Sequence, residues 1–343
     1  MKKLTLLLLA LLYVTLTYAY TERDLLQKQA DINRLKEILV LDRQWVTYPD
    51  YNDRAGWDRF LGTFKDEYIR RGEKRLNYQW QVVKATDYLA FERTGNRQIM
   101  EKPFGANNGA IADLLMAELA EGKGRFVDQL INGVFNACEM TSWALAAHII
   151  VQPSHRALPA YDYPVIDLTS GDLGGLLAWT YHFMRPSFDK VDPEISRRLR
   201  HELQTRILDP YMNNDSFWWM GRNYNGRMLN NWNPWCNSNA LMCFMLLEDN
   251  RDTLAKAVHL TMESVDKFLN YIKADGACEE GPSYWGHAAG KTLDYLELLS
   301  DITGDKVNIF NEPMIKNMGE YISRSYICLL YTSPSPRDRQ KSR

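Results

Sequence analysis

Apolar residues recur through the second half of the chain at the spacing of amphipathic helices. Three stripes show this period, with charged residues between the apolar positions. They comprise Ile195, Leu199, Leu203 and Ile207; Leu254, Val258, Met262, Val265, Leu269 and Ile272; and Leu293, Leu296, Leu299 and Ile302. Asp192 and Pro193 are the expected N-cap and first residue of the first helix, and Gly276 and Gly304 are expected to end the other two. Strand-like alternation is hard to find, so the pattern predicts an all-α fold.

The N-terminus carries an export signal. Lys2 and Lys3 precede an apolar run over residues 4–16 and a small residue, Ala19, at the expected cleavage site. This arrangement predicts a signal peptide over residues 1–19 and a periplasmic or extracellular protein. The apolar run is shorter than the roughly 20 residues of a spanning helix, so no membrane span is expected in the mature chain.

The C-terminal residues 328–343 have no apolar period and contain mostly Ser, Pro, Arg and other polar residues. They are expected to form a disordered tail, and they resemble translated sequencing-adaptor read-through. Residues 20–327 are then the expected folded domain, and the gene product is expected to be truncated.

Charge and cysteine content narrow the function classes. The formal net charge is −2, and the body between the two basic ends is mildly acidic, which argues against broad nucleic-acid or membrane-surface binding. The five cysteines lack paired C-x-x-C spacing, and the histidines lack metal-ligand spacing, so neither a metal nor another cofactor is expected. His148, His155, His182, His201 and His259 are expected to be structural or exposed.

Two segments, 230–239 and 275–287, combine asparagine amides, tryptophan rings, a tyrosine and a histidine. Their polarity and their Pro and Gly residues predict loops and helix ends outside the core. The chain also places five tryptophans in and near these segments, of which two or three are expected to form platforms for sugar rings. These are Trp218, Trp219, Trp232, Trp235 and Trp285.

These segments, and more weakly residues 136–143, resemble the heparinase II/III group of polysaccharide lyases. The likeness extends from about residue 21 to residue 327. It implies an (α/α) toroid of helical hairpins followed by a β-sandwich domain, and the sandwich is expected to be absent from this chain. It also implies β-elimination on an acidic, uronate-containing polysaccharide such as a glycosaminoglycan.

The resemblance assigns roles to individual residues. Tyr284 matches the tyrosine that transfers protons, and Asn231 the amide that neutralises the uronate carboxylate. Some relatives have histidine where this chain has Trp232, which favours Tyr284 as both base and acid, with His287 as a substitute. The expected substrate-binding residues are Asn233, Asn237, Trp232, Trp235, Trp285, Glu139, Arg222 and Arg227.

The chemistry of elimination explains these residue types. Amide donors stabilise the enolate-like charge that develops when the proton α to the carboxylate leaves. A free tyrosine has a pKa near 10, so a base near neutrality needs a neighbouring cation such as Lys291 or an arginine, or a hydrogen-bonded His287.

Two alternatives stay open. A glycoside hydrolase on a helical toroid would use a carboxylate pair drawn from Asp275, Glu279, Glu280 and Glu139. A non-catalytic glycan-binding module would use the aromatic cleft alone. Without a sandwich domain to cover the cleft, the chain by itself is expected to be a weak or inactive enzyme.

Overall fold

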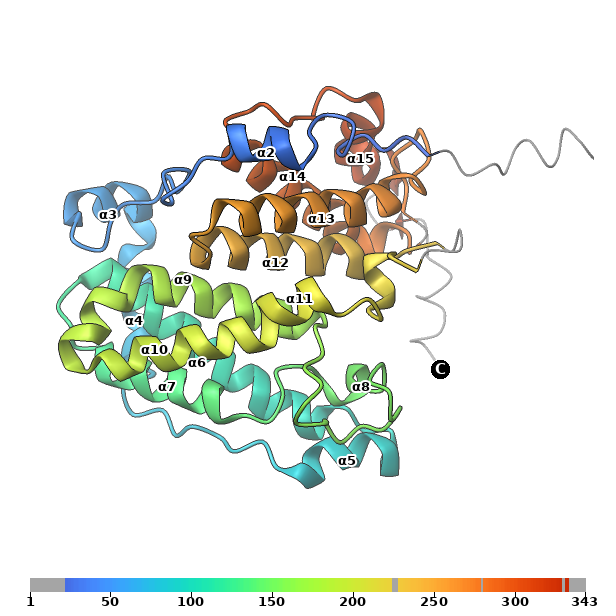
Figure 1. The fold of residues 1–343 in the computed structure, drawn as a ribbon. Helices are drawn as coiled ribbons and strands as arrows, with labels where there is room; N and C mark the ends of the chain where they lie inside the picture. Colours follow the sequence, from blue (N-terminus) through green and yellow to red (C-terminus); the bar gives the residue numbers. More distant parts are fainter. Residues whose placement is uncertain (1–21, 224–227, 279, 329–330, 333–343) are drawn as a thin grey trace, which may run out of the picture.

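The computed structural model describes residues 22–223, 228–278, 280–328 and 331–332, and these residues are overwhelmingly helical (Figure 1). The α-helices are α2 (Ile32–Ile38), α3 (Arg54–Leu61), α4 (Lys65–Glu73), α5 (Ala85–Thr94), α6 (Gln98–Glu121), α7 (Val127–Glu139), α8 (Ala146–Ile149), α9 (Leu168–Val191), α10 (Pro193–Leu203), α11 (Asp209–Asn213), α12 (Trp232–Leu247), α13 (Arg251–Leu269), α14 (Lys291–Ile302) and α15 (Pro313–Arg324). Short 3₁₀ segments are η1 (Gly62–Phe64), η3 (Trp218–Met220) and η4 (Pro282–Tyr284), and π-helical segments are η2 (Gln204–Leu208) and η5 (Gly286–Gly290). The predicted all-α class is confirmed.

The apolar stripes form buried helix faces as predicted. Asp192 caps α10 by accepting a hydrogen bond from the Glu194 backbone, and Pro193 is its first residue. The third stripe lies on α14, after which Gly304 has the positive φ of a C′ glycine. The second stripe ends earlier than predicted. Helix α13 stops at Leu269, and Gly276 lies in the next turn with a φ of +75°.

The described chain ends in a short two-stranded pairing. Strand β1 (Tyr326–Cys328) pairs antiparallel with β2 (Tyr331–Thr332), where a disordered tail was expected from residue 328. Residues 333–343 and the predicted signal peptide lie outside the described residues. Across the ranges that are described, no helix is both long enough and apolar enough to cross a membrane.

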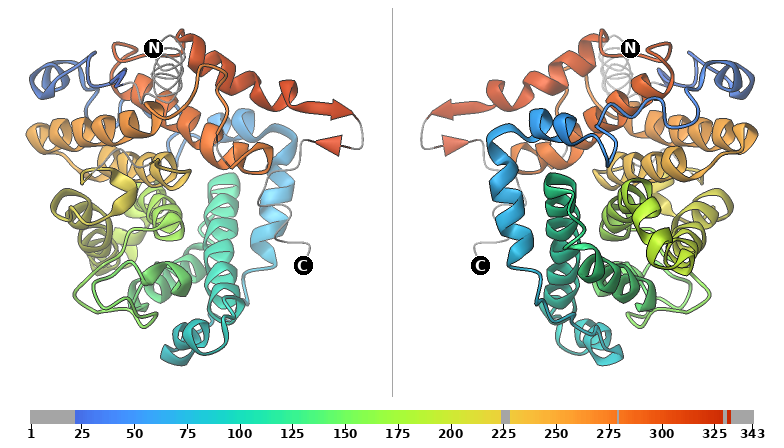
Figure 2. Two further views of the ribbon diagram at one scale, coloured as in Figure 1. Left: turned by 90° about the vertical axis from the view of Figure 1, so that its right-hand side faces the viewer. Right: turned by 90° about the vertical axis from the view of Figure 1, so that its left-hand side faces the viewer.

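Helix α12 occupies the centre of the C-terminal half, where it packs against α9, α13 and α14. In Figure 1 it lies between α13 and the pair α9 and α10, and Figure 2 shows α4 and α6 side by side below this group. Most residues of α12 are buried, and its second half carries apolar side chains such as Leu241, Phe244 and Leu247. Its first half is more polar and carries the site.

The first described residues pack onto α13, about 240 positions further along the chain. Leu26 and Gln27 donate their backbone N–H groups to the buried carboxylate of Asp266, each at a distance of 3.0 Å. The Arg23 guanidinium donates to the carbonyls of Leu269 and Ile272 just beyond. Gln29 also exchanges hydrogen bonds with the Asn308 backbone after α14, so the start of the described chain packs beside α13 and the segment that follows α14.

Candidate functional site

One face of α12 turns toward a cleft between α9 and α14. Trp232, Trp235, Asn239 and Met242 are spaced three or four residues apart, so the helical period places them on this face. The approach of α9 is close, because a Cβ added at Gly175 would lie 3.0 Å from Oδ1 of Asn239. Glycine in α9 thus permits the two helices to meet at Asn239.

Three predicted residues come together on this face. The imidazole of His287 stacks on the indole of Trp235, with ring centroids 4.7 Å apart and an interplanar angle of 13°. The ring of Tyr284 lies 5.9 Å from that of His287. The Lys291 ammonium lies 5.8 Å from the centre of the Trp235 ring. An imidazole and an ammonium therefore lie against one indole, and a phenol lies beside the imidazole.

Irregular backbone places Tyr284 and His287. Gly281 has φ +73° and ψ −170°, a conformation open almost only to glycine, and it precedes the 3₁₀ turn that ends at Tyr284. The π-helical turn η5 then carries His287 directly into α14. The Trp285 indole, between them, donates to the Met318 carbonyl over 2.8 Å and packs against the core. Trp285 therefore anchors this turn to α15 through its ring N–H, and the residue is partly exposed.

Asp172 of α9 completes the group around Trp235. Its Oδ1 accepts hydrogen bonds from the Trp235 indole at 2.7 Å and from the Asn239 amide at 2.9 Å. The Asp172 carboxylate touches solvent, yet the protein groups crowded around it desolvate it enough to raise its pKa. The two hydrogen bonds and the charge of Lys291 lower that pKa, but less strongly than desolvation raises it.

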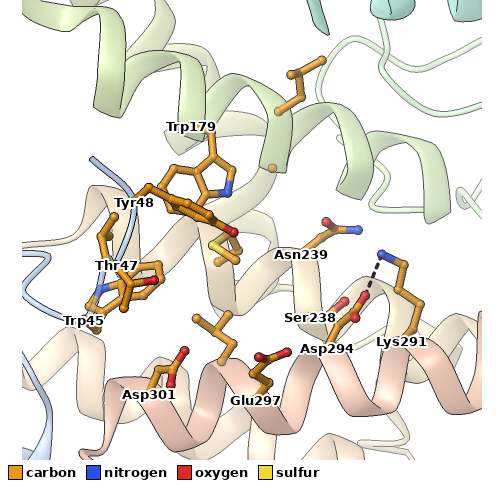
Figure 3. A pocket seen from close by; sticks show the side chains of 15 residues that line it. Trp45, Thr47, Tyr48, Trp179, Ser238, Asn239, Lys291, Asp294, Glu297 and Asp301 are labelled. Carbon is orange, nitrogen blue, oxygen red and sulfur yellow. Dashed lines mark ion pairs between the residues drawn. The ribbon is translucent and has the colours of Figure 1, made fainter. Parts of the chain in front are cut away.

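A pocket of about 420 Å³ continues from this group along the cleft, with Asn239 and Lys291 in its wall (Figure 3). Trp45, Tyr48 and Trp179 form an aromatic corner at its other end. The Tyr48 and Trp179 rings meet edge to face with centroids 5.3 Å apart, and Trp45 lies 5.9 Å from Trp179. The exposed Tyr48 ring and the partly exposed Trp179 ring suit contact with the faces of sugars, whereas Trp45 is buried.

Helix α14 gives the pocket an acidic floor. Asp294, Glu297 and Asp301 line it, whereas Lys291 is its one lining cation and pairs with Asp294 over 3.3 Å. Asp301 lies toward the aromatic end, Glu297 lies between, and Lys291 with its partner Asp294 lies toward the opposite end (Figure 3). The two ends of the pocket therefore differ in charge.

Asn231 lies at the N-cap position of α12, one turn before Trp235, and its side chain makes no capping hydrogen bond. The neighbouring Asn230 forms the local turn instead, because its Oδ1 accepts from the Trp232 backbone at 3.1 Å. The Asn231 residue is 5% exposed. Its side-chain amide therefore does not cap the helix.

Asn233 and Asn237 point to the opposite side of α12 and are fully buried. Asn233 donates to the backbone carbonyls of Trp219 and Ser264, and Asn237 donates to the Ser264 hydroxyl at 2.9 Å. Tyr211 donates to Asn237 in turn. These amides join α12 to α13 and η3, so the prediction that they bind substrate does not agree with the structure.

Trp232 stands beside a histidine that was expected to be structural or exposed. The His148 ring meets Trp232 edge to face with centroids 4.6 Å apart. Nδ1 of His148 lies 2.6 Å from Oδ2 of the buried Asp167, which also caps α9. The exposed Trp218 lies on Trp232 as well, with centroids 5.4 Å apart.

The remaining predicted residues lie apart from this group or outside the description. Arg222 is paired with Asp215 at 2.6 Å and donates to the Tyr211 carbonyl. Glu139 is exposed at the C-terminal end of α7, near Arg198. Trp219 is buried and donates its indole N–H to the Ile166 carbonyl. Arg227 lies outside the described residues.

The carboxylates of the hydrolase alternative do not form an evident pair. Asp275 is exposed and accepts from the Ala277 backbone, whereas Glu280 is buried. Glu139 belongs to α7, and Glu279 lies outside the described residues. The carboxylates that line the 420 Å³ pocket are those of α14, which the sequence interpretation did not select.

Within the described ranges, no group of three or more His, Cys, Asp or Glu side chains is arranged to hold a metal ion. No protein-family model matches the chain, and its sequence matches no curated protein.

Asp172, Asn239 and the aromatic corner were missed by the sequence interpretation. Asn239 had a usable signal, because it lies seven residues after Trp232 on the same helical face. Asp172 had a weaker one, as a charged residue among the glycines of α9. Trp45 and Tyr48 come from a turn far away in sequence, and no local pattern connects them to α12.

Proposed function

We propose that the protein is a polysaccharide lyase of the heparinase II/III type, which cleaves a uronate-containing polysaccharide by β-elimination. The observation that carries the proposal is the placement of the Tyr284 ring beside the His287 ring. The His287 imidazole and the Lys291 ammonium both lie against the Trp235 indole. A phenol that must lose and regain a proton is assisted by cationic and imidazole neighbours, because they stabilise its phenolate form.

In the proposed reaction, Tyr284 removes the proton from the carbon α to the uronate carboxylate. The electrons of that C–H bond form a carbon–carbon double bond, and the β carbon–oxygen bond breaks. The leaving oxygen takes a proton from the same side of the sugar, which the Tyr284 hydroxyl can return. The Asn231 amide, one turn from Trp235, is the donor that would stabilise charge developing on the carboxylate.

The charges in the cleft suggest how a substrate lies in it. Glu297 and Asp301 disfavour a uronate at the aromatic end, whereas Lys291, which pairs with Asp294, supplies a positive group at the other end. The aromatic corner then suits a sugar without negative charge, which rests on Tyr48 or Trp179. The proposed substrate therefore has an uncharged sugar next to the uronate that is cleaved.

The proposal extends to architecture. The helices would form the (α/α) toroid of this class, with α12 and α14 contributing to its cleft and a β-sandwich domain as the usual neighbour. The extensive helix-to-helix packing and the absence of any larger sheet among the described residues support the toroid.

A second candidate is a glycoside hydrolase. It is favoured by one observation, the row of α14 carboxylates beside the aromatic corner, because hydrolases act through paired carboxyl groups in such a cleft. A lyase and a hydrolase both create new reducing ends. Only the lyase creates a carbon–carbon double bond conjugated with the carboxylate.

The test is an incubation of the protein, in excess over substrate, with non-sulfated and sulfated uronate polysaccharides and with a neutral polysaccharide. We expect ultraviolet absorbance to rise in step with reducing ends on a non-sulfated uronate polymer. Reducing ends without absorbance would establish the hydrolase. Binding measured by calorimetry, with neither product, would establish a binding module and overturn the proposed lyase.

A further inference from the structure

The sequence predicts Trp235 as a sugar platform, yet the structure covers one of its faces with protein. The His287 imidazole lies almost parallel to the indole at 4.7 Å, which is within stacking distance. The Lys291 ammonium is also within range of the same ring. A sugar cannot occupy the face on which His287 lies, so another role must explain the orientation of this indole.

The orientation is fixed at the edge of the ring. Nε1 of Trp235 donates to Oδ1 of Asp172 over 2.7 Å, which is short for a hydrogen bond from nitrogen to a carboxylate. The same oxygen accepts from the Asn239 amide, so the carboxylate is itself held in place. Asn239 in turn is packed against Gly171 and Gly175 of α9.

We propose that Asp172 is a positioning residue, which holds the Trp235 indole in one plane and thereby holds the His287 imidazole beside Tyr284. This inference rests on the proposed lyase function for its catalytic consequence, but its structural part stands by itself. Asp172 does not contact the reacting atoms in this account. It acts through the indole.

The chemistry of the ring supports this role. A tryptophan ring attracts cations at its face, and a carboxylate at its N–H edge polarises the indole toward greater electron density. The arrangement therefore favours the Lys291 ammonium beside the same ring. Without the hydrogen bond, the indole gains freedom to rotate, and the imidazole loses the surface that orients it.

The test uses three variants of the full chain, Asp172→Ala, Asp172→Asn and Trp235→Phe. The structural readout is the NMR signal of the His287 ring protons, assigned among the six histidines with His287→Gln. Stacking on the indole shifts these protons upfield. We expect Asp172→Ala to move them downfield, and Asp172→Asn to restore most of the shift because its oxygen can still accept from the indole.

The kinetic readout is kcat for elimination. We expect Asp172→Ala to lower kcat by about 10- to 10²-fold with a smaller change in KM, since misplacement of a catalytic group by about 1 Å has effects of this size. Trp235→Phe, which keeps an aromatic ring but loses the N–H donor, should lower kcat similarly. Adding Asp172→Ala to Trp235→Phe should then have little further effect.

Several results would overturn the proposal. One is that the His287 ring-proton shifts of Asp172→Ala equal those of the wild type. Another is that Asp172→Asn and Asp172→Ala lower kcat equally. A third is that the two substitutions of the double variant lower kcat independently. If Asp172→Ala does not fold, unchanged His287 ring-proton shifts in Trp235→Phe would overturn the proposal instead. If the wild-type protein shows no elimination, the proposed function fails, and the NMR comparison still decides whether Asp172 positions His287.

Discussion

The Trp285 indole donates its N–H to the backbone carbonyl of Met318 over 2.8 Å, and this bond joins the turn that carries Tyr284 to α15. A second tie lies close by, where the Asn317 amide donates to the Ala274 carbonyl over 2.7 Å. Gly276 also approaches the α15 backbone so closely that an added Cβ would lie 2.2 Å from the Met318 nitrogen. The position of the turn that carries Tyr284 therefore depends on the position of α15.

Trp285→Phe should lower kcat because it releases this turn from α15. The loss of one hydrogen bond should reduce the free energy of unfolding by about 1 kcal/mol. Trp57→Phe is the matched control, since the Trp57 indole also donates to a backbone carbonyl, that of Asp50, but on α3. Urea titration and turnover should show similar destabilisation in both variants and a loss of kcat in Trp285→Phe alone. Equal kcat values would show that the turn does not depend on this bond.

Tyr284→Phe should reduce elimination by at least about 10²-fold, the usual contribution of a general acid–base group. The substitution removes only the oxygen that carries the proton, so the melting temperature and the oligosaccharide affinity should stay close to those of the wild type. Single-turnover absorbance measures the first quantity, and calorimetry the second. More than about a tenth of wild-type turnover would exclude Tyr284 as the base.

Asn231 and Asn230 should separate catalysis from local structure. Asn231→Ala should lower kcat by about 10²-fold, as loss of a donor to developing charge does. Asn230→Ala should instead cost about 1 kcal/mol of stability and leave kcat nearly unchanged, because Asn230 supports the turn before α12. Turnover and thermal melting measure the two effects. If Asn230→Ala lowers kcat and Asn231→Ala lowers only stability, Asn230 is the catalytic amide and Asn231 supports the turn.

Tyr48→Ala should weaken oligosaccharide binding about tenfold, or ~1.4 kcal/mol, if the aromatic corner holds a sugar ring. Turnover at saturation should change little, because Tyr48 lies at the far end of the pocket from Lys291. Phe64→Ala provides the control, since Phe64 is an exposed aromatic residue that does not line the pocket. Equal affinities for the two variants would show that the corner is not a subsite.

Asp266 should make stability fall as the pH rises. Burial raises its pKa to about 6, against the hydrogen bonds from Gln27 and Leu26, which lower it. Because the unfolded value is near 3.9, the folded state binds more protons than the unfolded state between about pH 4 and pH 6. The contribution is fully present below pH 4 and is lost as the pH rises through 6, a change of about 3 kcal/mol.

Asp266→Asn removes this titration. The unfolding free energy of the wild type minus that of the variant should therefore decrease by about 2 kcal/mol from pH 4 to pH 6.5, as measured by urea titration. A difference that stays constant with pH would show that Asp266 does not titrate in this range.

The sequence predicted the helices better than it predicted the site. Apolar stripes identify buried faces of α10, α13 and α14 because helical period and burial are linked locally. Tyr284 and His287 come together because they are only three residues apart on a helical turn. Asn233 and Asn237 were misplaced because a polar segment was interpreted as exposed, whereas α12 begins at Trp232 and turns these amides inward. Asp172 meets Trp235 only through the packing of α9 on α12, which no local spacing specifies.

The attachment of the first described residues to α13 determines when the fold can close during synthesis. Leu26 and Asp266 are 240 positions apart, so a ribosome adding about 5–20 residues per second needs roughly 10–50 s to supply the partner. During that interval Leu26, which is fully buried in the finished fold, remains exposed on the nascent chain. Long-range closure of this kind is also slow in refolding. The N-terminal segment should therefore be a target for holding chaperones until α13 has been made.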